Sequence, residues 1–325
     1  MKAIRIEAPG PDYRLVLGSE AAPKPGPGEV LIKVAAAGLN FADLMQARGK
    51  YPPPPGASTI LGMEVSGTII ELGAAVSQWK TGDKVCALLS GGGYAEEVVA
   101  DAGSLLPLPD GIDLVEAAGL PEAVFTAWTN IVDSGRLQPG ESLLIHGGTS
   151  GIGSLAIQMF AVRGHYIFTT MGSEAKCEAA RKLGAARAIN YREEDFVAVV
   201  KEETGGKGVA VILDMIGGDY IQRNIEAAAL WGRIVNIAYQ NGFKAELNFL
   251  PAFVKNLTLA GTRLRGRTSE QKQAIRDAVR REVWPLIGSQ IRPVTDRVFS
   301  WDQASQAHEY MAKTGHIGKI LLQMT

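Results

Sequence analysis

The first 120 residues consist of short apolar segments separated by turn-forming residues. Residues 30–34 (Val-Leu-Ile-Lys-Val) are rich in β-branched side chains, and residues 23–28 before them contain three Pro and two Gly. Residues 67–73 form another short apolar run between two glycines. Pro and Gly interrupt regular structure, and closely spaced short strands are typical of sandwiches and barrels. This part of the chain is therefore predicted to form a mostly β, partly open barrel.

A different pattern begins near residue 122, where continuous apolar runs alternate with segments of helical periodicity. The periodic segments predict helices over 154–163, 174–183 and 195–204. Apolar strands that alternate with helices are typical of a doubly wound parallel sheet, the Rossmann type of α/β fold, because helices cover both faces of such a sheet. The predicted strands are 142–146, 166–170, 188–190, 209–214, 232–237 and 257–261.

The last 60 or so residues contain a predicted helix over 269–286 and a predicted strand over 319–322. They are too few to bury a core of their own, so we expect them to pack against the N-terminal barrel. The predicted division is one domain of residues 1–121 with 262–325, and a second domain of residues 122–261.

Charge and composition exclude several classes of protein. The 325 residues include 33 Lys and Arg against 34 Asp and Glu, a net charge of −1, which argues against nucleic acid as a partner. No uninterrupted apolar run of about 20 residues occurs, so no membrane-spanning helix is expected. Cys86 and Cys177 are too few for a disulfide framework or a thiolate zinc site. Because the N-terminus also lacks an apolar signal core, we expect a cytoplasmic protein.

The strongest local motif lies between the first strand and the first helix of the second domain. Residues 147–153 read Gly-Gly-Thr-Ser-Gly-Ile-Gly. Glycines permit a tight turn and a close approach of the backbone to a pyrophosphate, and the helix N-terminus supplies free N–H groups. In this setting the motif predicts dinucleotide binding, whereas a turn that only packs helix on sheet is the simpler alternative. The candidate residues are Gly148, Ser150, Gly151, Ile152 and Gly153.

The end of the second strand indicates which dinucleotide is bound. Proteins that bind NAD usually place Asp or Glu there, about 20 residues beyond the glycine loop. Residues 170–173 read Thr-Met-Gly-Ser and contain no carboxylate. Ser173 and Lys176 offer a hydroxyl and a cation for a 2′-phosphate, and Tyr191 is expected at the adenine end. The sequence therefore favours NADPH, with a solvated Lys176 and a Tyr191 ring at the core edge as the alternatives.

Several catalytic motifs are missing, among them Tyr-x-x-x-Lys, Gly-x-Ser-x-Gly and His-Glu-x-x-His. Other motifs are present, at residues 38–43, 49–52, 61–64, 92–96, 125–128, 145–153, 183–185 and 317–320. Through these motifs the whole chain resembles the medium-chain dehydrogenases/reductases, in the zinc-free quinone oxidoreductase branch that includes zeta-crystallin. It is most similar there to the tumour-suppressor-inducible quinone oxidoreductase subgroup. The resemblance implies a GroES-like barrel beside the Rossmann domain.

Differences from the zinc-dependent members of that superfamily predict that no metal is bound. Those enzymes have Cys at the position of Asn40 and His at the position of Met63, and they carry a four-cysteine lobe after the region of residues 92–94. Methionine is not a zinc ligand at such a site, and a neutral Asn is a weak one. No cysteine follows residues 92–94 in this chain until Cys177.

The resemblance also implies roles for single residues. Thr126 would hold the nicotinamide carboxamide, and the backbone amides of Gly151 and Ile152 would meet the pyrophosphate. Asn40 and Tyr51 would line the substrate pocket beside the nicotinamide, with a turn residue and a loop ring as their structural alternatives. Lys319 would come near the cofactor phosphates. Homodimers formed through a sheet edge are common in this family, and residues 257–260 are a plausible edge here.

These observations predict NADPH-dependent, zinc-independent reduction of a quinone. Hydride addition to a conjugated carbonyl spreads the developing charge, so positioning supplies much of the acceleration. The Tyr51 hydroxyl, the Asn40 amide or water would stabilise the oxyanion. One-electron and two-electron reduction both remain open. So do two other functions: an enone or enoyl reductase, and an NADPH-binding, crystallin-like or regulatory protein with little turnover.

Overall fold

The computed structural model describes residues 1–324, and their contacts divide the chain into two compact units. One unit contains Met1–Phe125 together with the residues from Arg265 onwards, and the other is Thr126–Leu264. The α-helix α3 (Pro121–Ala127) contains the first boundary and is followed by a π-helical stretch, Trp128–Ser134. No helix in the described part of the chain has the length and apolar run needed to cross a bilayer.

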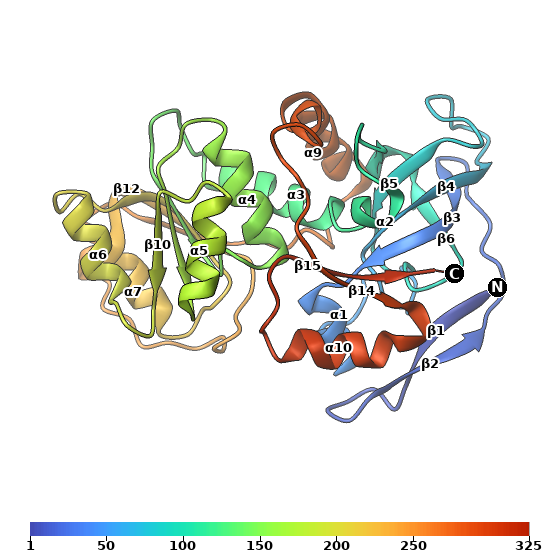
Figure 1. Cartoon of the computed structure of the whole chain (residues 1–325), viewed down its shortest axis with the longest axis horizontal. Helices are drawn as coiled ribbons and strands as arrows, with labels where there is room; N and C mark the ends of the chain where they lie inside the picture. The colour runs from blue at the N-terminus through green and yellow to red at the C-terminus, as the bar shows by residue number, and fades with distance from the viewer. Residues whose placement is uncertain (325) are drawn as a thin grey trace. The chain divides into compact units, whose positions relative to one another are not determined.

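The first unit is built on a mixed seven-stranded sheet with the order β14-β15-β3-β4-β5-β7, in which β6 also pairs with β3 (Figure 1). A separate hairpin pairs β1 with β2. The helices of the first unit include α1 (Phe41–Ala47), α2 (Leu114–Ala117), α9 (Ser269–Glu282) and α10 (Ala304–Ala312). The strands are β1 (Lys2–Glu7), β2 (Arg14–Ser19), β3 (Glu29–Gly38), β4 (Glu64–Leu72), β5 (Lys84–Leu88), β6 (Glu97–Asp101), β7 (Leu105–Pro107), β14 (Thr295–Ser300) and β15 (Lys319–Gln323).

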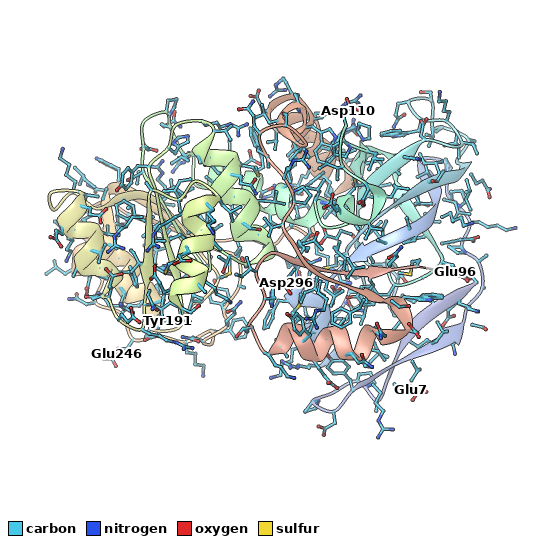
Figure 2. All side chains as sticks on the ribbon, in the orientation of Figure 1. Glu7, Glu96, Asp110, Tyr191, Glu246 and Asp296 are labelled. Carbon is cyan, nitrogen blue, oxygen red and sulfur yellow. The ribbon has the colours of Figure 1, made fainter. Side chains whose placement is uncertain are left out.

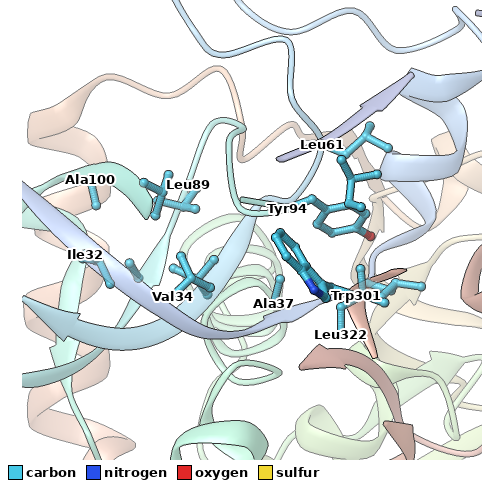
Figure 3. Close-up of a cluster of buried hydrophobic side chains, with 14 of the residues drawn as sticks. Ile32, Val34, Ala37, Leu61, Leu89, Tyr94, Ala100, Trp301 and Leu322 are labelled. Atoms are coloured by element: carbon cyan, nitrogen blue, oxygen red, sulfur yellow. The ribbon is translucent and has the colours of Figure 1, made fainter. Parts of the chain in front are cut away.

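Residues from both ends of the chain form the core of this unit. Strand β15 pairs antiparallel with β3, so that Leu322 lies opposite Ala37. Figure 3 shows Trp301 and Leu322 among side chains from the N-terminal part of the chain, including Val34 of β3 and Tyr94 between β5 and β6. The C-terminal residues thus pack on the N-terminal barrel, as their small number predicted.

The second unit is a six-stranded, wholly parallel sheet with the order β10-β9-β8-β11-β12-β13. The chain runs outward from β8 to β10 and then returns to β11 on the other side of β8, which confirms the doubly wound fold. Ligands of such sheets bind beyond the carboxyl ends of the strands at this change of direction. The strands are β8 (Leu143–His146), β9 (Ile167–Met171), β10 (Arg187–Asn190), β11 (Val209–Asp214), β12 (Ala228–Asn236) and β13 (Thr258–Gly261). The helices are α4 (Gly151–Ala161), α5 (Glu174–Lys182), α6 (Phe196–Glu203), α7 (Tyr220–Ala227) and α8 (Leu250–Val254).

Two helix boundaries differ from the predictions for identifiable reasons. Helix α4 begins three residues before residue 154, because Ser150 is its N-cap and its hydroxyl accepts a hydrogen bond from the Gly153 N–H. Helix α9 ends at Glu282 instead of residue 286. Pro285 has no N–H and its ring obstructs a continuing α-helix, so Trp284–Leu286 forms a short 3₁₀ turn.

Candidate functional site

The glycine loop connects β8 to α4 at the carboxyl end of the parallel sheet. The Ser150 hydroxyl accepts a hydrogen bond from the Gly153 N–H at 3.0 Å, while Gly151 and Ile152 are the first two residues of the helix. The N–H groups of a first helical turn have no acceptor within the helix. Two amides and the positive end of the helix dipole are therefore available to an anion at this point.

Three of the loop glycines are required by their surroundings. Gly147 has φ +69°, a conformation that side chains disfavour. A Cβ on Gly148 would overlap Thr169 Oγ1, and one on Gly153 would overlap Gly147 O. The loop is thus pressed against β9 and against itself, and this glycine cradle tolerates no side chain at the three positions.

The three residues predicted to contact the adenosine of a dinucleotide lie just after β9 and β10. Gly172 follows β9, and a Cβ on it would lie 2.5 Å from Tyr191 Oη. Ser173 is the N-cap of α5 without a side-chain cap bond, and Lys176 lies half-buried in the first turn. The exposed Tyr191 ring, labelled in Figure 2, follows β10.

One cation at this end was missed by the sequence reasoning. Arg192 Nε lies 3.5 Å from the same Cβ position on Gly172. The signal was its place directly after Tyr191, at the end of the third strand. The nearest acid along the chain, Glu174, is exposed and bonds Arg181 at 2.7 Å. The end of β9 therefore presents hydroxyl and cationic groups in place of a ribose-binding carboxylate.

A buried polar network supports the loop from behind. His146 Nε2 contacts Asn224 Oδ1 at 2.7 Å and its Nδ1 contacts Thr170 Oγ1 at 2.9 Å. Asn224 and Asn236 both donate through Nδ2 to the buried carboxylate of Asp214. Because the Asn224 oxygen must accept, His146 carries its proton on Nε2. Burial lowers the pKa of His146, which keeps the ring neutral. His146 thus packs and aligns strand ends.

Thr126 is buried at the start of the second unit, where its carbonyl accepts a hydrogen bond from Asn130 Nδ2 at 2.8 Å. The remaining predicted site residues, Asn40, Tyr51 and Lys319, belong to the first unit.

Asn40 and Lys319 meet in a buried cluster with Glu64. Asn40 Nδ2 donates to Glu64 Oε1 at 2.9 Å, and the Lys319 ammonium donates to Asn40 Oδ1 and to the carbonyl of Leu39, each at 2.9 Å. Lys319 also forms an ion pair with Glu64, whose side chain is fully buried. An ammonium has three protons, and these three acceptors use all of them. The Lys319 ammonium thus holds Asn40 and Glu64 within the first unit, and its approach to the cofactor phosphates stays a prediction.

A second buried series of hydrogen bonds fixes the N-terminus of α1, where Asn40 is the N-cap. Asp43 accepts hydrogen bonds from the Asn40 N–H at 2.8 Å and the Gly62 N–H at 3.1 Å. The Tyr94 hydroxyl donates to the same carboxylate at 3.4 Å and contacts His308 Nε2 at 3.3 Å. Burial raises the pKa of Asp43 to about 6 despite the two backbone donors, and burial lowers the pKa of His308 to about 3. The capping-box spacing of Asn40 and Asp43 was the available sequence signal.

Glu122 adds a further carboxyl beside this cluster. Its backbone N–H donates to Glu64 Oε2 at 2.9 Å, so both oxygens of Glu64 are occupied. Burial, reinforced by the neighbouring Glu64 carboxylate, raises the pKa of Glu122 to about 7. No spacing rule in the sequence indicated this residue, because the charges around it come from β4, β15, α1 and α9.

Tyr51 follows α1 in a half-buried position, and the guanidinium of Arg265 lies 5.4 Å from the centre of its ring. Within residues 1–324 no group of three or more His, Cys, Asp or Glu side chains is arranged to hold a metal ion. Met63, at the position of a zinc-ligating His in related enzymes, is buried beside Glu64 in the chain.

Two family models match the chain. Residues 26–110 match the alcohol dehydrogenase GroES-like domain, and residues 151–280 match the zinc-binding dehydrogenase family. Quinone oxidoreductase-like protein 2 of Mus musculus is 32% identical over 309 residues, which is 94% of this chain and 88% of that protein.

Solved structures of similar proteins cover nearly the whole chain. Quinone oxidoreductase of Escherichia coli in complex with NADPH aligns with a TM-score of 0.85 and 26% identity, covering 99% of both chains. The CurK enoyl reductase aligns with a TM-score of 0.86 and 27% identity, covering 100% of this chain and 99% of that one. The chain also matches a polyketide synthase subunit of Mycobacterium tuberculosis at 30% identity, but it spans only 15% of the length of that protein.

Proposed function

The chain belongs to the medium-chain dehydrogenase/reductase superfamily, and we propose that it is an NADPH-dependent, zinc-independent quinone oxidoreductase. The observation that carries the cofactor assignment is the glycine cradle followed by a strand end with Ser173, Lys176 and Arg192 and no carboxylate. Hydroxyl and cationic groups suit a 2′-phosphate, whereas a carboxylate suits a ribose diol. NADPH in the E. coli relative supports the same choice.

The proposed chemistry uses few groups of the protein. When bound, NADPH supplies the hydride from C4 of its nicotinamide. We assign to Tyr51 the hydrogen bond to the developing oxyanion, with water as the proton source. Asn40 is a positioning residue in this proposal, because Glu64 and Lys319 already occupy its amide. This differs from the expectation that the Asn40 amide stabilises the oxyanion.

The buried Glu64–Lys319 pair supports zinc independence. In zinc-dependent relatives the residues at the positions of Asn40 and Met63 are zinc ligands. Here Asn40 is hydrogen-bonded to Glu64 of the Glu64–Lys319 ion pair, whose net charge is zero. A ketone reductase needs an electrophile or strong acid beside the alkoxide that forms. A conjugated carbonyl needs less, because its charge is delocalised.

The deciding experiment is NADPH oxidation by metal-free protein with three acceptors: an ortho-quinone, a medium-chain enal and a saturated ketone. We expect the quinone to be reduced fastest and the ketone not at all. Loss of quinone turnover after chelation, or equal turnover of the ketone, would overturn the zinc-free assignment. Tight NADPH binding without oxidation by any acceptor would favour a binding protein.

An enone or enoyl reductase is the second candidate. It is favoured by the similarity to the CurK enoyl reductase and by the match to a polyketide synthase subunit. The same hydride geometry serves both reactions. Faster turnover of the enal or of an enoyl thioester than of the quinone would select this alternative.

We further propose a homodimer formed through β13, the edge strand of the parallel sheet. Apolar side chains lie exposed around this edge, which suits a surface that a second copy covers. Light scattering at micromolar concentration should give twice the mass of the chain, and a monomer mass would contradict the proposal. The exposed apolar side chains around β13 are those of Leu230, Trp231, Phe249, Leu250, Phe253, Val254 and Leu259.

We also propose a cytoplasmic location, because Cys86 and Cys177 are buried free thiols.

A further inference from the structure

Two buried cations, one of them beside the Tyr51 ring, lie outside the glycine loop and outside the Asn40 cluster. Arg265 is 5% exposed and Lys272, in the first turn of α9, is 8% exposed. Arg265 Nε donates to the Ser90 carbonyl and Lys272 Nζ donates to the Ser90 hydroxyl, each at 2.8 Å. The two positive charges therefore share one small residue, and the guanidinium also faces the Tyr51 ring.

The segments around the two cations are held by hydrogen bonds and close packing. Arg265 Nη2 donates to Gln46 Oε1 at 2.7 Å, and Gln46 Nε2 donates to the Thr59 carbonyl at 2.9 Å, which fixes the direction of the amide. Gly91, after Ser90, has φ +146°, and a Cβ on it would lie 2.6 Å from the Ser58 carbonyl. The loop thus approaches its neighbours more closely than a side chain permits.

The two cations differ in their countercharges: the charge of Arg265 acts on the buried carboxyl of Asp43, whereas Lys272 has no close countercharge among residues 1–324. In the described part of the chain, no carboxylate lies within ion-pair distance of Lys272, and its hydrogen-bond partner is a neutral hydroxyl. The carboxyls that act on it from a distance are Glu122 and Asp101. Glu122, with its pKa raised to about 7, is only partly ionised at neutral pH. Burial and the neighbouring Arg265 both lower the pKa of Lys272.

A buried charge without a close countercharge is costly, and proteins keep such groups where a ligand completes the balance. We propose that Arg265 and Lys272 form an oxyanion subsite for the electron acceptor, next to the Tyr51 ring. The substrate class is then a conjugated carbonyl compound that also bears a carboxylate, sulfonate or phosphate. The Lys272 ammonium would donate to such an anion, and the fixed positive charge of Arg265, shared with Lys272 through Ser90, would add to the attraction. This inference rests on the proposed function and narrows its substrate.

The test compares 1,2-naphthoquinone with 1,2-naphthoquinone-4-sulfonate as acceptors, since the two differ by one anionic group. The variant Lys272→Met removes the ammonium and keeps the length of the side chain. Arg280→Met removes an exposed cation from the same helix and serves as the control for net charge. The ratio of kcat/KM for the sulfonate to kcat/KM for the neutral quinone should fall about tenfold in Lys272→Met, because a hydrogen bond between charged groups is lost. The same ratio should fall less than about twofold in Arg280→Met, since exposed charges are screened.

An equal effect of both substitutions on this ratio would overturn the subsite. A weaker affinity of Lys272→Met for NADPH, measured by fluorescence titration, would assign the cations to the cofactor instead and would also overturn it. Calorimetric binding of the two quinones to the NADP⁺-saturated protein separates this inference from the proposed function. If neither quinone is reduced but the sulfonate still binds about tenfold more tightly in a Lys272-dependent way, the subsite stands and the quinone activity fails.

Discussion

The buried ion pair between Lys319 and Glu64 gives a sharp prediction about stability. Replacing Lys319 with Met removes the ammonium and leaves a fully buried carboxylate without its cation. Breaking one side of a buried pair costs about 3–5 kcal/mol, because the remaining charge is uncompensated. The Asn40 and Glu122 N–H donors stay on Glu64 and offset part of this loss. We therefore expect Lys319→Met to lower the free energy of unfolding by about 3 kcal/mol.

The double variant Lys319→Met/Glu64→Gln tests the cause. It removes both charges and keeps the shapes, so it should be more stable than Lys319→Met alone by about 2 kcal/mol, a coupling expected of residues in contact. Urea unfolding followed by tryptophan fluorescence measures the stability of both variants, since Trp79, Trp284 and Trp301 belong to the first unit, which also contains Lys319 and Glu64. Lys313→Met, at an exposed site, is the control. A loss below about 1 kcal/mol in Lys319→Met, or additive effects in the double variant, would refute the reasoning.

Three further outcomes are expected. Gly153→Ala should weaken NADPH binding at least about tenfold because its Cβ overlaps Gly147 O, while Gly28→Ala, with open space around it, should bind as wild type does; calorimetry of both variants decides this. Arg192→Ala should raise the Kd for NADPH about tenfold and leave that for NADH nearly constant, and an equal change for both cofactors would contradict a 2′-phosphate contact. Glu122 has a folded-state pKa raised from 4.5 to about 7, so its contribution to stability is greatest below about pH 4.5 and declines as the pH rises toward 7. In Glu122→Gln the urea unfolding midpoint should therefore fall less between pH 4.5 and 7 than it does in the wild type. An unchanged dependence of the midpoint on pH would argue against a raised pKa of Glu122.

The parallel sheet was predictable because its strands are apolar on both faces and differ strongly from the helices between them. The predicted strand at 209–214 coincides with β11, and the glycine loop lies where the motif placed it. Local chemistry was enough here, since a strand, a turn and a capped helix follow one another in the sequence.

The buried polar clusters were not predictable in the same way. Lys319 binds Leu39 just after β3, Glu64 of β4 and Asn40 at the N-terminus of α1, and nothing within its own neighbourhood in the sequence encodes those partners. The same holds for His308, which joins the distant hydroxyls of Tyr13 and Tyr94. The end of α9 is a different case, because Pro285 was visible and would have placed the boundary correctly.

The position of β15 in the interior of its sheet has a consequence for the order of folding. Residues 126–264 are contiguous, so that unit can close its sheet as soon as its own chain has been synthesised. Strand β3 is made early, yet its neighbour β15 becomes available only after about 280 further residues have been translated. During that interval residues 36–38 of β3 lack their partner strand, and the side chains that Trp301 and Leu322 later cover remain accessible. During synthesis, the first unit therefore needs protection by cellular factors against premature association for longer than the second unit does.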